Sequence, residues 1–394
     1  MAHHYRIGAL IALGLWLSSE TAATDTNSSL NAEVMLATAM SQINAQQPAQ
    51  ALTTLELLIQ RYPHFQLAQM MRADLLYAQT NTLTQIGAHL SNKQTQQLQA
   101  EARARLNAVT QLAEQQQPAY LLGAAPHWLN TLITIDLTAS RAYFFSLEHG
   151  RLVFKTSFYL TQGSLGAGKE KEGDKRTPVG IYRLEKPIPA QKLSGFYGAG
   201  ALPLDYPNSW DKRNNRTGHG IWLHGTPFEQ YSRPPLASDG CVVFSNDDMG
   251  YLLQSLDWKS TLVVTDHQLT WKNAETEALA QQLSQRLSAW RHSWEQQQLP
   301  SYLAFYAPDF ISQKNENKTQ WANRKQQLFN MGQAHHIHIH EVLTLRYPAQ
   351  NNLVITEFEQ RYQRAGKSEQ ERKRLWWQLQ QGEWLIIHEE ILSN

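Results

Sequence analysis

Apolar residues recur every three or four positions through the first third of the chain, from about residue 27 to residue 117. The recurring positions are Leu30, Val34, Ala37, Met40, Ile43, Leu52, Leu55, Leu58, Leu67, Met70 and Leu75. This spacing is that of one face of an amphipathic helix. Pro48 and Pro63 fall between the runs, where a residue without an N–H ends a helix. The pattern therefore predicts a series of separate helices.

Two of these helices and the turn between them resemble a tetratricopeptide-like pair, over residues 49–58, 61–63 and 68–73. A single pair cannot bury its own apolar face, so it must pack on a neighbour or on a second protomer. A Gln-rich helix near residues 94–117 follows, and the region carries no cluster of reactive side chains. We interpret residues 24–120 as a segment for a homodimer or protein partner rather than a ligand site.

From about residue 128 the periodicity becomes that of strands. Short β-branched and aromatic runs alternate with turn residues, at 132–135, 141–145, 152–154, 156–161, 180–184, 220–224, 241–244 and 262–265. This pattern predicts a mostly β domain over residues 128–267. The glycines at 163, 166, 168 and 173 precede no helix, so we do not expect them to form a phosphate-binding loop.

From about residue 275 helical and strand-like runs follow one another. Helices are predicted at 279–294, 301–306 and 319–329, and strands at 336–347, 353–362, 373–380 and 383–391. Helices followed by antiparallel strands favour a curved sheet around a helical layer. We therefore expect a cone-shaped α+β domain over residues 275–394, and a multidomain chain with an all-α, a mostly β and an α+β part.

Composition narrows the functional classes. The 394 residues suit two or three domains, and the formal net charge of +1 argues against nucleic acid as a partner. A single cysteine excludes internal disulfides and Cys-rich zinc modules. His336, His338 and His340 alternate along one predicted strand but have no evident carboxylate companion, so we expect no metal and no organic cofactor.

The first 23 residues are typical of a secretory signal peptide. A mildly basic start is followed by the apolar run 7–17 and by small residues up to Ala23, after which we expect cleavage. The apolar run is shorter than the roughly 20 residues that span a bilayer. The expected location is therefore the periplasm. A lone thiol in an oxidising compartment is more readily explained by chemistry than by pairing.

The lone cysteine, Cys241, follows a small-residue turn and precedes a strand-like run, which would expose its sulfur at a loop–strand junction. His224 ends a predicted strand 17 residues earlier, so the loop can return beside it. A thiol becomes a nucleophile when a base or a positive charge is near it, and imidazole is the usual partner. The plainer alternative for an isolated cysteine is a small buried hydrophobic residue.

These residues resemble the signature of the YkuD-type L,D-transpeptidases. The resemblance rests on His224-Gly225-Thr226, on Ser238-Asp239-Gly240-Cys241 and on the Gly-Asp-Lys-Arg-Thr-Pro-Val-Gly-Ile-Tyr block at 173–182. It implies that Cys241 is the nucleophile, that His224 is the general base and that the Gly225 carbonyl orients the imidazole. It also implies that the backbone amides of Gly240 and Cys241 stabilise the oxyanion.

One position departs from the family. Asp239 stands where the family commonly has a second histidine, and a carboxylate there raises the thiol pKa because it disfavours a second negative charge. We expect Ser238, Asp239, His219 and Trp222 to line the substrate groove. Arg233, between base and nucleophile, would meet a substrate carboxylate, with a surface charge as the alternative. The mixed charges and glycine of 169–175 suggest a flexible loop over the cleft.

The C-terminal aromatic motifs resemble a nuclear-transport-factor-2-like (NTF2-like) domain, in 302–310, 321–324 and 382–387 among others. A YkuD-type domain followed by this fold resembles the cell-shape-determining enzymes that trim peptidoglycan tetrapeptide stems to tripeptides. The resemblance implies thioester acyl transfer, as an L,D-carboxypeptidase or an L,D-transpeptidase. The alternatives are an amidase that releases wall-attached lipoprotein and an inactive wall-binding protein. Trp290, Trp294 and Tyr306 either form core or line a site for a small glycan.

Overall fold

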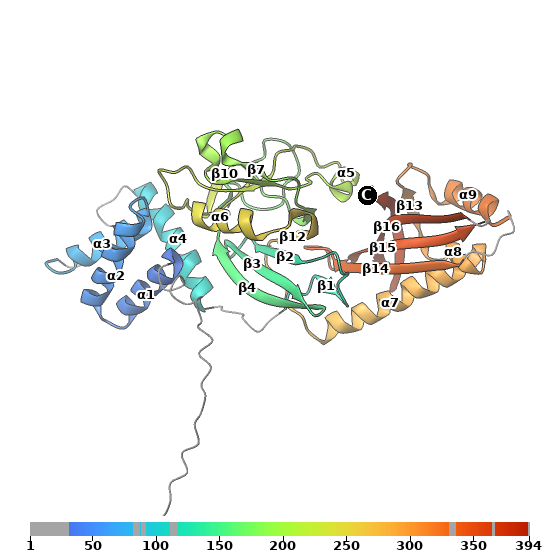
Figure 1. Cartoon of the computed structure of the whole chain (residues 1–394), viewed down its shortest axis with the longest axis horizontal. Helices are drawn as coiled ribbons and strands as arrows, with labels where there is room; N and C mark the ends of the chain where they lie inside the picture. Colours follow the sequence, from blue (N-terminus) through green and yellow to red (C-terminus); the bar gives the residue numbers. More distant parts are fainter. Residues whose placement is uncertain are drawn as a thin grey trace, which may run out of the picture.

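The computed structural model describes residues 31–81, 87, 92–110, 117–330, 336–364 and 367–392. The predicted signal peptide, residues 1–23, lies outside them. Figure 1 shows a helical region at one end, a β-rich region in the middle and a curved sheet with its helices at the other end. The predicted all-α, mostly β and α+β organisation is therefore confirmed. Within the described ranges, no helix has both the length and the apolar character needed to cross a membrane.

The N-terminal region contains the helices α1 (Ala32–Asn44), α2 (Pro48–Arg61), α3 (Gln66–Tyr77) and α4 (Asn92–Thr110). The Asn31 side chain caps α1 by accepting the Glu33 N–H at 2.8 Å, and Pro48 opens α2, where its missing N–H costs nothing. The apolar faces meet in a common core that includes Leu55 and Phe65. The sequence predicted that this region must pack on a neighbour or on a second protomer. The helices pack in part on the central domain of the same chain.

Two sheets enclose the core of the central domain. The larger has the order β4-β3-β2-β12-β6 and the smaller β11-β9-β8-β7, with β5 and β10 forming a separate pair. Their bounds are β2 Thr131–Asp136, β3 Arg141–Glu148, β4 Arg151–Tyr159, β5 Gln162–Gly163, β6 Gly180–Arg183, β7 Ile188–Pro189, β8 Gly200–Pro203, β9 Trp222–His224, β10 Leu236–Ser238, β11 Val242–Val243 and β12 Thr261–Asp266. Helices α5 (Ser209–Arg213) and α6 (Asn246–Ser255) flank them. Burial of Ile133, Leu223 and Val263 between the sheets fixes their relative position.

The C-terminal domain is a six-stranded sheet of order β1-β14-β15-β16-β17-β13. Its strands are β1 Leu121–Leu122, β13 Tyr306–Ser312, β14 Ile337–Arg346, β15 Leu353–Arg364, β16 Lys367–Gln380 and β17 Glu383–Leu392, and its helices are α7 Ala274–Glu295, α8 Leu299–Leu303 and α9 Lys318–Asn330. The predicted end of the helix at 301–306 is wrong. Helix α8 ends at Leu303, and Tyr306 begins strand β13. The sequence also missed β1, which precedes the central domain but pairs with β14.

A buried ion cluster joins the central and C-terminal domains. Glu357 on β15 accepts from Arg183 of the central domain at 2.5 Å, from Arg372 at 3.1 Å and from Arg374 at 2.6 Å and 2.9 Å. Beside it Trp210 stacks on Trp376, with ring centroids 4.9 Å apart. The two domains therefore share a packed, charge-compensated interface.

Candidate active site

Cys241 lies at the junction between a tight turn and strand β11. The Ser238 hydroxyl accepts the Gly240 N–H at 3.1 Å and donates to the Cys241 carbonyl at 2.6 Å, which closes the turn. Gly240 has a φ of +125°, and a Cβ there would lie 2.8 Å from the Arg176 carbonyl oxygen. The backbone thus requires glycine just before the thiol. Because the Gly240 amide is engaged by Ser238, the Cys241 amide is the better candidate for oxyanion stabilisation.

The thiol contacts the backbone of the strand that carries the histidine. Cys241 Sγ lies 3.4 Å from the Trp222 N–H, which donates to it, and 3.4 Å from the Gly220 carbonyl oxygen. Strands β9 and β11 are parallel, with Val243 opposite His224. Pairing of these two short strands places the turn before Cys241 beside the strand that ends at His224.

The imidazole of His224 is buried and its orientation is set by one hydrogen bond. Nδ1 lies 2.7 Å from the Gly225 carbonyl oxygen, which can only accept, so Nδ1 carries the proton and Nε2 has the free lone pair. Gly225 itself is enclosed, since a Cβ there would lie 2.3 Å from Asn246 Oδ1. Burial lowers the pKa of His224 to about 4, and the nearby Arg233 charge acts in the same direction. The imidazole is therefore neutral at pH 7 and able to accept a proton.

The thiol is also neutral at pH 7. Burial raises the pKa of Cys241 above its ordinary value, the Trp222 N–H lowers it, and the Asp239 carboxylate raises it further. Lys169 and Arg233 lower the pKa of the thiol through their charges. Both pKa shifts therefore favour a neutral thiol and a neutral imidazole over a thiolate–imidazolium pair. Asp239 is mostly exposed and lies 3.7 Å from Lys175 Nζ.

Arg233 comes close to both groups from the loop between them. Its guanidinium donates to the Ala237 carbonyl and lies 5.5 Å from the Phe196 ring, which in turn lies 6.1 Å from the His224 ring. Its Nη1 is buried and has no hydrogen-bond partner. A buried donor without an acceptor favours the sequence interpretation of Arg233 as a group that meets a substrate carboxylate.

The other predicted groove residues differ in their surroundings. His219 is 82% exposed, 3.9 Å from Glu172, whereas Trp222 is half-buried against Tyr197, with ring centroids 5.0 Å apart. Aromatic neighbours from the turn Gly195–Tyr197 were not predicted, because no local pattern marks them. Phe196 is 49% exposed at this position.

Residues 169–175, expected from the sequence to form a flexible loop over the cleft, make several polar contacts within the loop. Lys169 is buried, and its Nζ donates to Asp174 Oδ1 at 2.8 Å and to the Lys171 carbonyl at 3.1 Å. The Asp174 carboxylate also accepts the N–H groups of Glu170, Lys171 and Arg176. Burial alone would raise its pKa, but these hydrogen bonds lower the pKa of Asp174 to about 2. Its own polar contacts organise the loop.

Two supporting residues were missed from the sequence. Thr177 donates to the Gly240 carbonyl at 3.0 Å and accepts the Gly163 N–H at 2.9 Å, so it connects the turn before Cys241 to β5. Asn246 accepts the Ala199 N–H at 2.8 Å and donates to the Thr226 carbonyl at 2.9 Å, beside Gly225. The Thr-Pro pair of the recognised block could have pointed to Thr177, but nothing local marks Asn246.

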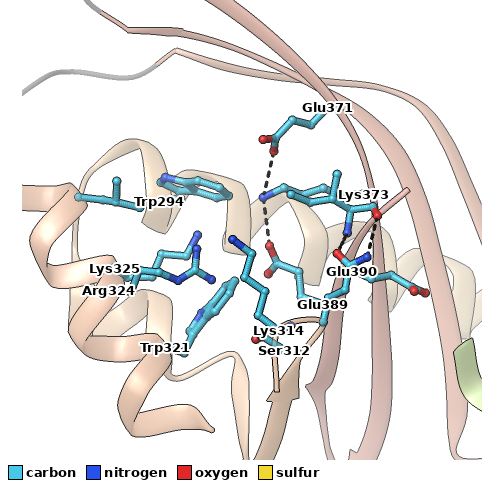
Figure 2. A pocket seen from close by; sticks show the side chains of 13 residues that line it. Trp294, Ser312, Lys314, Trp321, Arg324, Lys325, Glu371, Lys373, Glu389 and Glu390 are labelled. Carbon is cyan, nitrogen blue, oxygen red and sulfur yellow. Dashed lines mark hydrogen bonds and ion pairs between the residues drawn. The ribbon is translucent and has the colours of Figure 1, made fainter. Parts of the chain in front are cut away.

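A second hollow lies in the C-terminal domain, away from Cys241. Figure 2 shows Lys325 between the rings of Trp294 and Trp321, and its Nζ lies 4.1 Å and 4.4 Å from their centroids. Lys373 lies 4.3 Å from the Trp294 ring and 3.0 Å from Glu389. Burial, and then the charge of Lys373, lower the pKa of Lys325 to about 7. Lys314 and Arg324 line the same hollow together with Glu371, Glu389 and Glu390, so its polar lining carries charges of both signs.

The three aromatic residues named for this domain separate into two roles. Trp290 and Tyr306 are fully buried core, hydrogen-bonded to each other at 3.1 Å, whereas Trp294 lines the hollow.

Two of the histidines of the predicted strand lie on β14, where His338 is exposed and His340 lies 3.1 Å from Glu359. In the part of the chain that the structure describes, no group of three His, Cys, Asp or Glu side chains has an arrangement that could hold a metal.

Two family models match the chain. Residues 130–265 match the L,D-transpeptidase catalytic domain, YkuD, and residues 282–390 match the Cds6 C-terminal NTF2-like domain. The resemblance stated from the motifs is therefore confirmed: this chain carries a YkuD L,D-transpeptidase domain followed by an NTF2-like domain. Helices α1–α4 lie outside both matches.

Solved structures match about seven tenths of the chain. Bd1075 from Bdellovibrio bacteriovorus matches with a TM-score of 0.61 and 25% identity, over 71% of this chain and 99% of Bd1075. The helical cell shape determining protein Pgp2 from Campylobacter jejuni matches with a TM-score of 0.60 and 23% identity, over 70% of this chain and 95% of Pgp2. No curated protein sequence matches the chain.

Proposed function

We propose that the chain is an exported cysteine enzyme that trims peptidoglycan stem peptides, removing the terminal D-residue of a tetrapeptide to leave a tripeptide. The YkuD match supports action on peptidoglycan peptides, and the observation that carries the mechanism is the buried neutral His224, tethered through Nδ1, beside the turn that bears Cys241. The order of a YkuD domain followed by an NTF2-like domain resembles that of the cell-shape-determining enzymes that trim stem peptides, which favours trimming over cross-linking. Periplasmic location, with cleavage after Ala23, is part of the proposal.

The proposed reaction is acyl transfer through a thioester. The Cys241 thiol gives its proton to His224 Nε2 as sulfur attacks the carbonyl at the L-centre of the diamino acid. The C–N bond to the terminal D-residue then breaks, and the leaving amine takes the proton from His224. Water, deprotonated by His224, attacks the thioester, releases the tripeptide and restores the thiol. The Cys241 amide would donate to the oxyanion, and Arg233 would bind the terminal carboxylate of the substrate.

Incubation of the purified full chain with disaccharide-tetrapeptide tests this proposal. We expect disaccharide-tripeptide and free D-amino acid as products, measured by liquid chromatography with mass spectrometry. Cross-linked dimers would instead identify a transpeptidase. Release of wall-attached lipoprotein from whole sacculi would identify the amidase. Unchanged substrate in both assays would indicate an inactive wall-binding protein.

A small glycan with an acidic group is the proposed ligand of the C-terminal hollow. The Trp294 ring borders the hollow, and Lys325 is a buried amine with no carboxylate in hydrogen-bond contact among the described residues. Because its pKa is about 7, Lys325 gains charge as the pH falls from 8 to 6. A sugar carboxylate remains ionised over that range. Binding should therefore be tighter at pH 6.

N-acetylmuramic acid is a suitable probe for calorimetric titration of the full chain. We expect Lys325→Met to weaken binding about tenfold at pH 6 and to remove the dependence on pH. Lys259→Met is the matched control, since Lys259 also lies over a tryptophan but is exposed on the central domain. Equal affinities of wild type and Lys325→Met would contradict the assignment.

A further inference from the structure

The α1–α4 region contacts the central domain through a buried network of charged side chains. Arg105 on α4 pairs with Glu33 of α1 and, at 2.9 Å, with Glu101. Glu33 also lies 3.5 Å from Arg141 of β3. The side chains of Arg105 and Glu101 are 3% and 2% exposed. Buried charges of this kind persist only where each has its partner, so the network fixes where these helices lie on the central domain.

The helices also hold one loop of the central domain, residues 226–235, which connects β9 and its histidine to β10. Tyr231 packs on the turn between α2 and α3, with ring centroids 4.3 Å from Phe65 and 5.1 Å from Tyr62, and its N–H donates to the His64 carbonyl at 3.3 Å. The Ser232 hydroxyl donates to Glu101 at 2.7 Å. Two consecutive residues of the loop are therefore bound by the α1–α4 region, which lies outside both matched domains.

The next residue of the loop is Arg233. Its carbonyl accepts from Tyr159 at 2.9 Å and from Thr161 at 2.9 Å, and the Arg105 guanidinium lies 4.0 Å from the Tyr159 ring. The Arg233 side chain then runs toward the active site, where it lies 5.5 Å from the Phe196 ring and keeps a buried, unpartnered Nη1. The backbone on both sides of this side chain is thus anchored.

We propose that the α1–α4 region positions a group of the active site. By binding Tyr231 and Ser232, it holds the Arg233 guanidinium where the substrate carboxylate binds. The inference rests on the proposed function in taking Arg233 as the carboxylate-binding group. These helices would therefore act on the active site of their own chain. Tyr231 and Ser232 are positioning residues, since they act through Arg233.

The test compares Tyr231→Ala with Tyr77→Ala in the full chain. Tyr77 is a half-exposed tyrosine on α3 and serves as the matched control. With disaccharide-tetrapeptide we expect Tyr231→Ala to raise KM about tenfold and to change kcat less than threefold, because the loss concerns one charge-assisted contact. In an Arg233→Ala background, Tyr231→Ala should add less than twofold. The proposal is overturned if KM stays at the Tyr77→Ala value or if the tenfold effect persists without Arg233.

A second readout needs no substrate. Arg233, Lys169, Asp239 and His224 are the charged or titratable groups around the Cys241 thiol, and withdrawal of Arg233 removes a positive charge. The pH midpoint of iodoacetamide alkylation should therefore rise in Tyr231→Ala and in Arg233→Ala, but no further in the double variant. This result separates failure of the inference from failure of the proposed reaction. Ser232→Ala removes only the hydrogen bond to Glu101 and should shift KM and the alkylation midpoint in the same directions. This variant tests the proposal if Tyr231→Ala does not fold.

Discussion

We expect the kcat of the Cys241→Ala variant on disaccharide-tetrapeptide to be at least about 10⁴-fold lower than that of the wild type, because no thioester can form without the thiol. The variant should unfold at the wild-type temperature, since alanine fits the same turn. Ser255→Ala, an exposed position at the end of α6 in the same domain, is the control for a small side-chain deletion and should keep full activity. Turnover by Cys241→Ala within tenfold of wild type would refute a cysteine mechanism.

The same thiol makes the resting protonation state measurable. The chain has one cysteine, so mass spectrometry of alkylated protein reports Cys241 alone. Because burial raises its pKa, the alkylation rate should keep rising with pH through the range from 7 to 9. A thiolate–imidazolium pair would instead give a rate that is already constant near pH 6. Asp239→Asn should move the curve to lower pH by a small amount, because the carboxylate is exposed and screened.

The largest effect on stability should come from Glu357→Gln. This change leaves three buried or half-buried guanidinium groups without their shared carboxylate, and removing one partner of a buried charge cluster costs about 3–5 kcal/mol. Glu359→Gln is the matched control on the same face of β15, where Glu359 is partly exposed and should cost less than about 1 kcal/mol. Urea unfolding of the full chain measures both values. Equal midpoints for the two variants would contradict the assigned role of the cluster.

Acidification should reproduce part of this loss in the wild type. Burial would raise the pKa of Glu357, but Arg374, Arg183 and Arg372 outweigh it and lower the pKa to about 2. A carboxyl whose folded pKa is depressed stabilises the fold fully above its unfolded pKa of about 4.5 and loses that contribution as the pH falls to 2. The difference corresponds to about 3 kcal/mol. Glu357→Gln should remove this part of the pH dependence.

The elements were predicted most reliably where the chain carries a long local pattern. The helical spacing around Leu55 and Leu67 and the strand-like run in 353–362 each extend over several turns or residues, so local sequence suffices to indicate helix or strand. The two-residue strand Leu121–Leu122 was missed because it has no pattern of its own and exists only through pairing with β14. Tyr306 was assigned to a helix because aromatic residues pack equally well in either element.

The active-site candidates divide in the same way. Cys241, His224 and Gly240 were found because their residue types and spacing carry the chemistry and the turn. The sequence did not predict the roles of Thr177 and Asn246 or the contacts between the N-terminal region and Tyr231. Each of these contacts joins residues that no short motif links; Glu101 and Ser232, for example, are 131 positions apart.

The amino-acid sequence alone shows three regions of different periodicity, and one cysteine and one histidine at motif spacing. These properties follow from neighbouring residues, whose side-chain types and intervals are visible in the linear order. The fold was needed to show that burial shifts the pKa of both groups, that residues 169–175 are held by Asp174 and that the α1–α4 region contacts the loop of Arg233. Burial and charge at a site depend on segments brought together from distant parts of the chain, and local pattern does not record which segments meet.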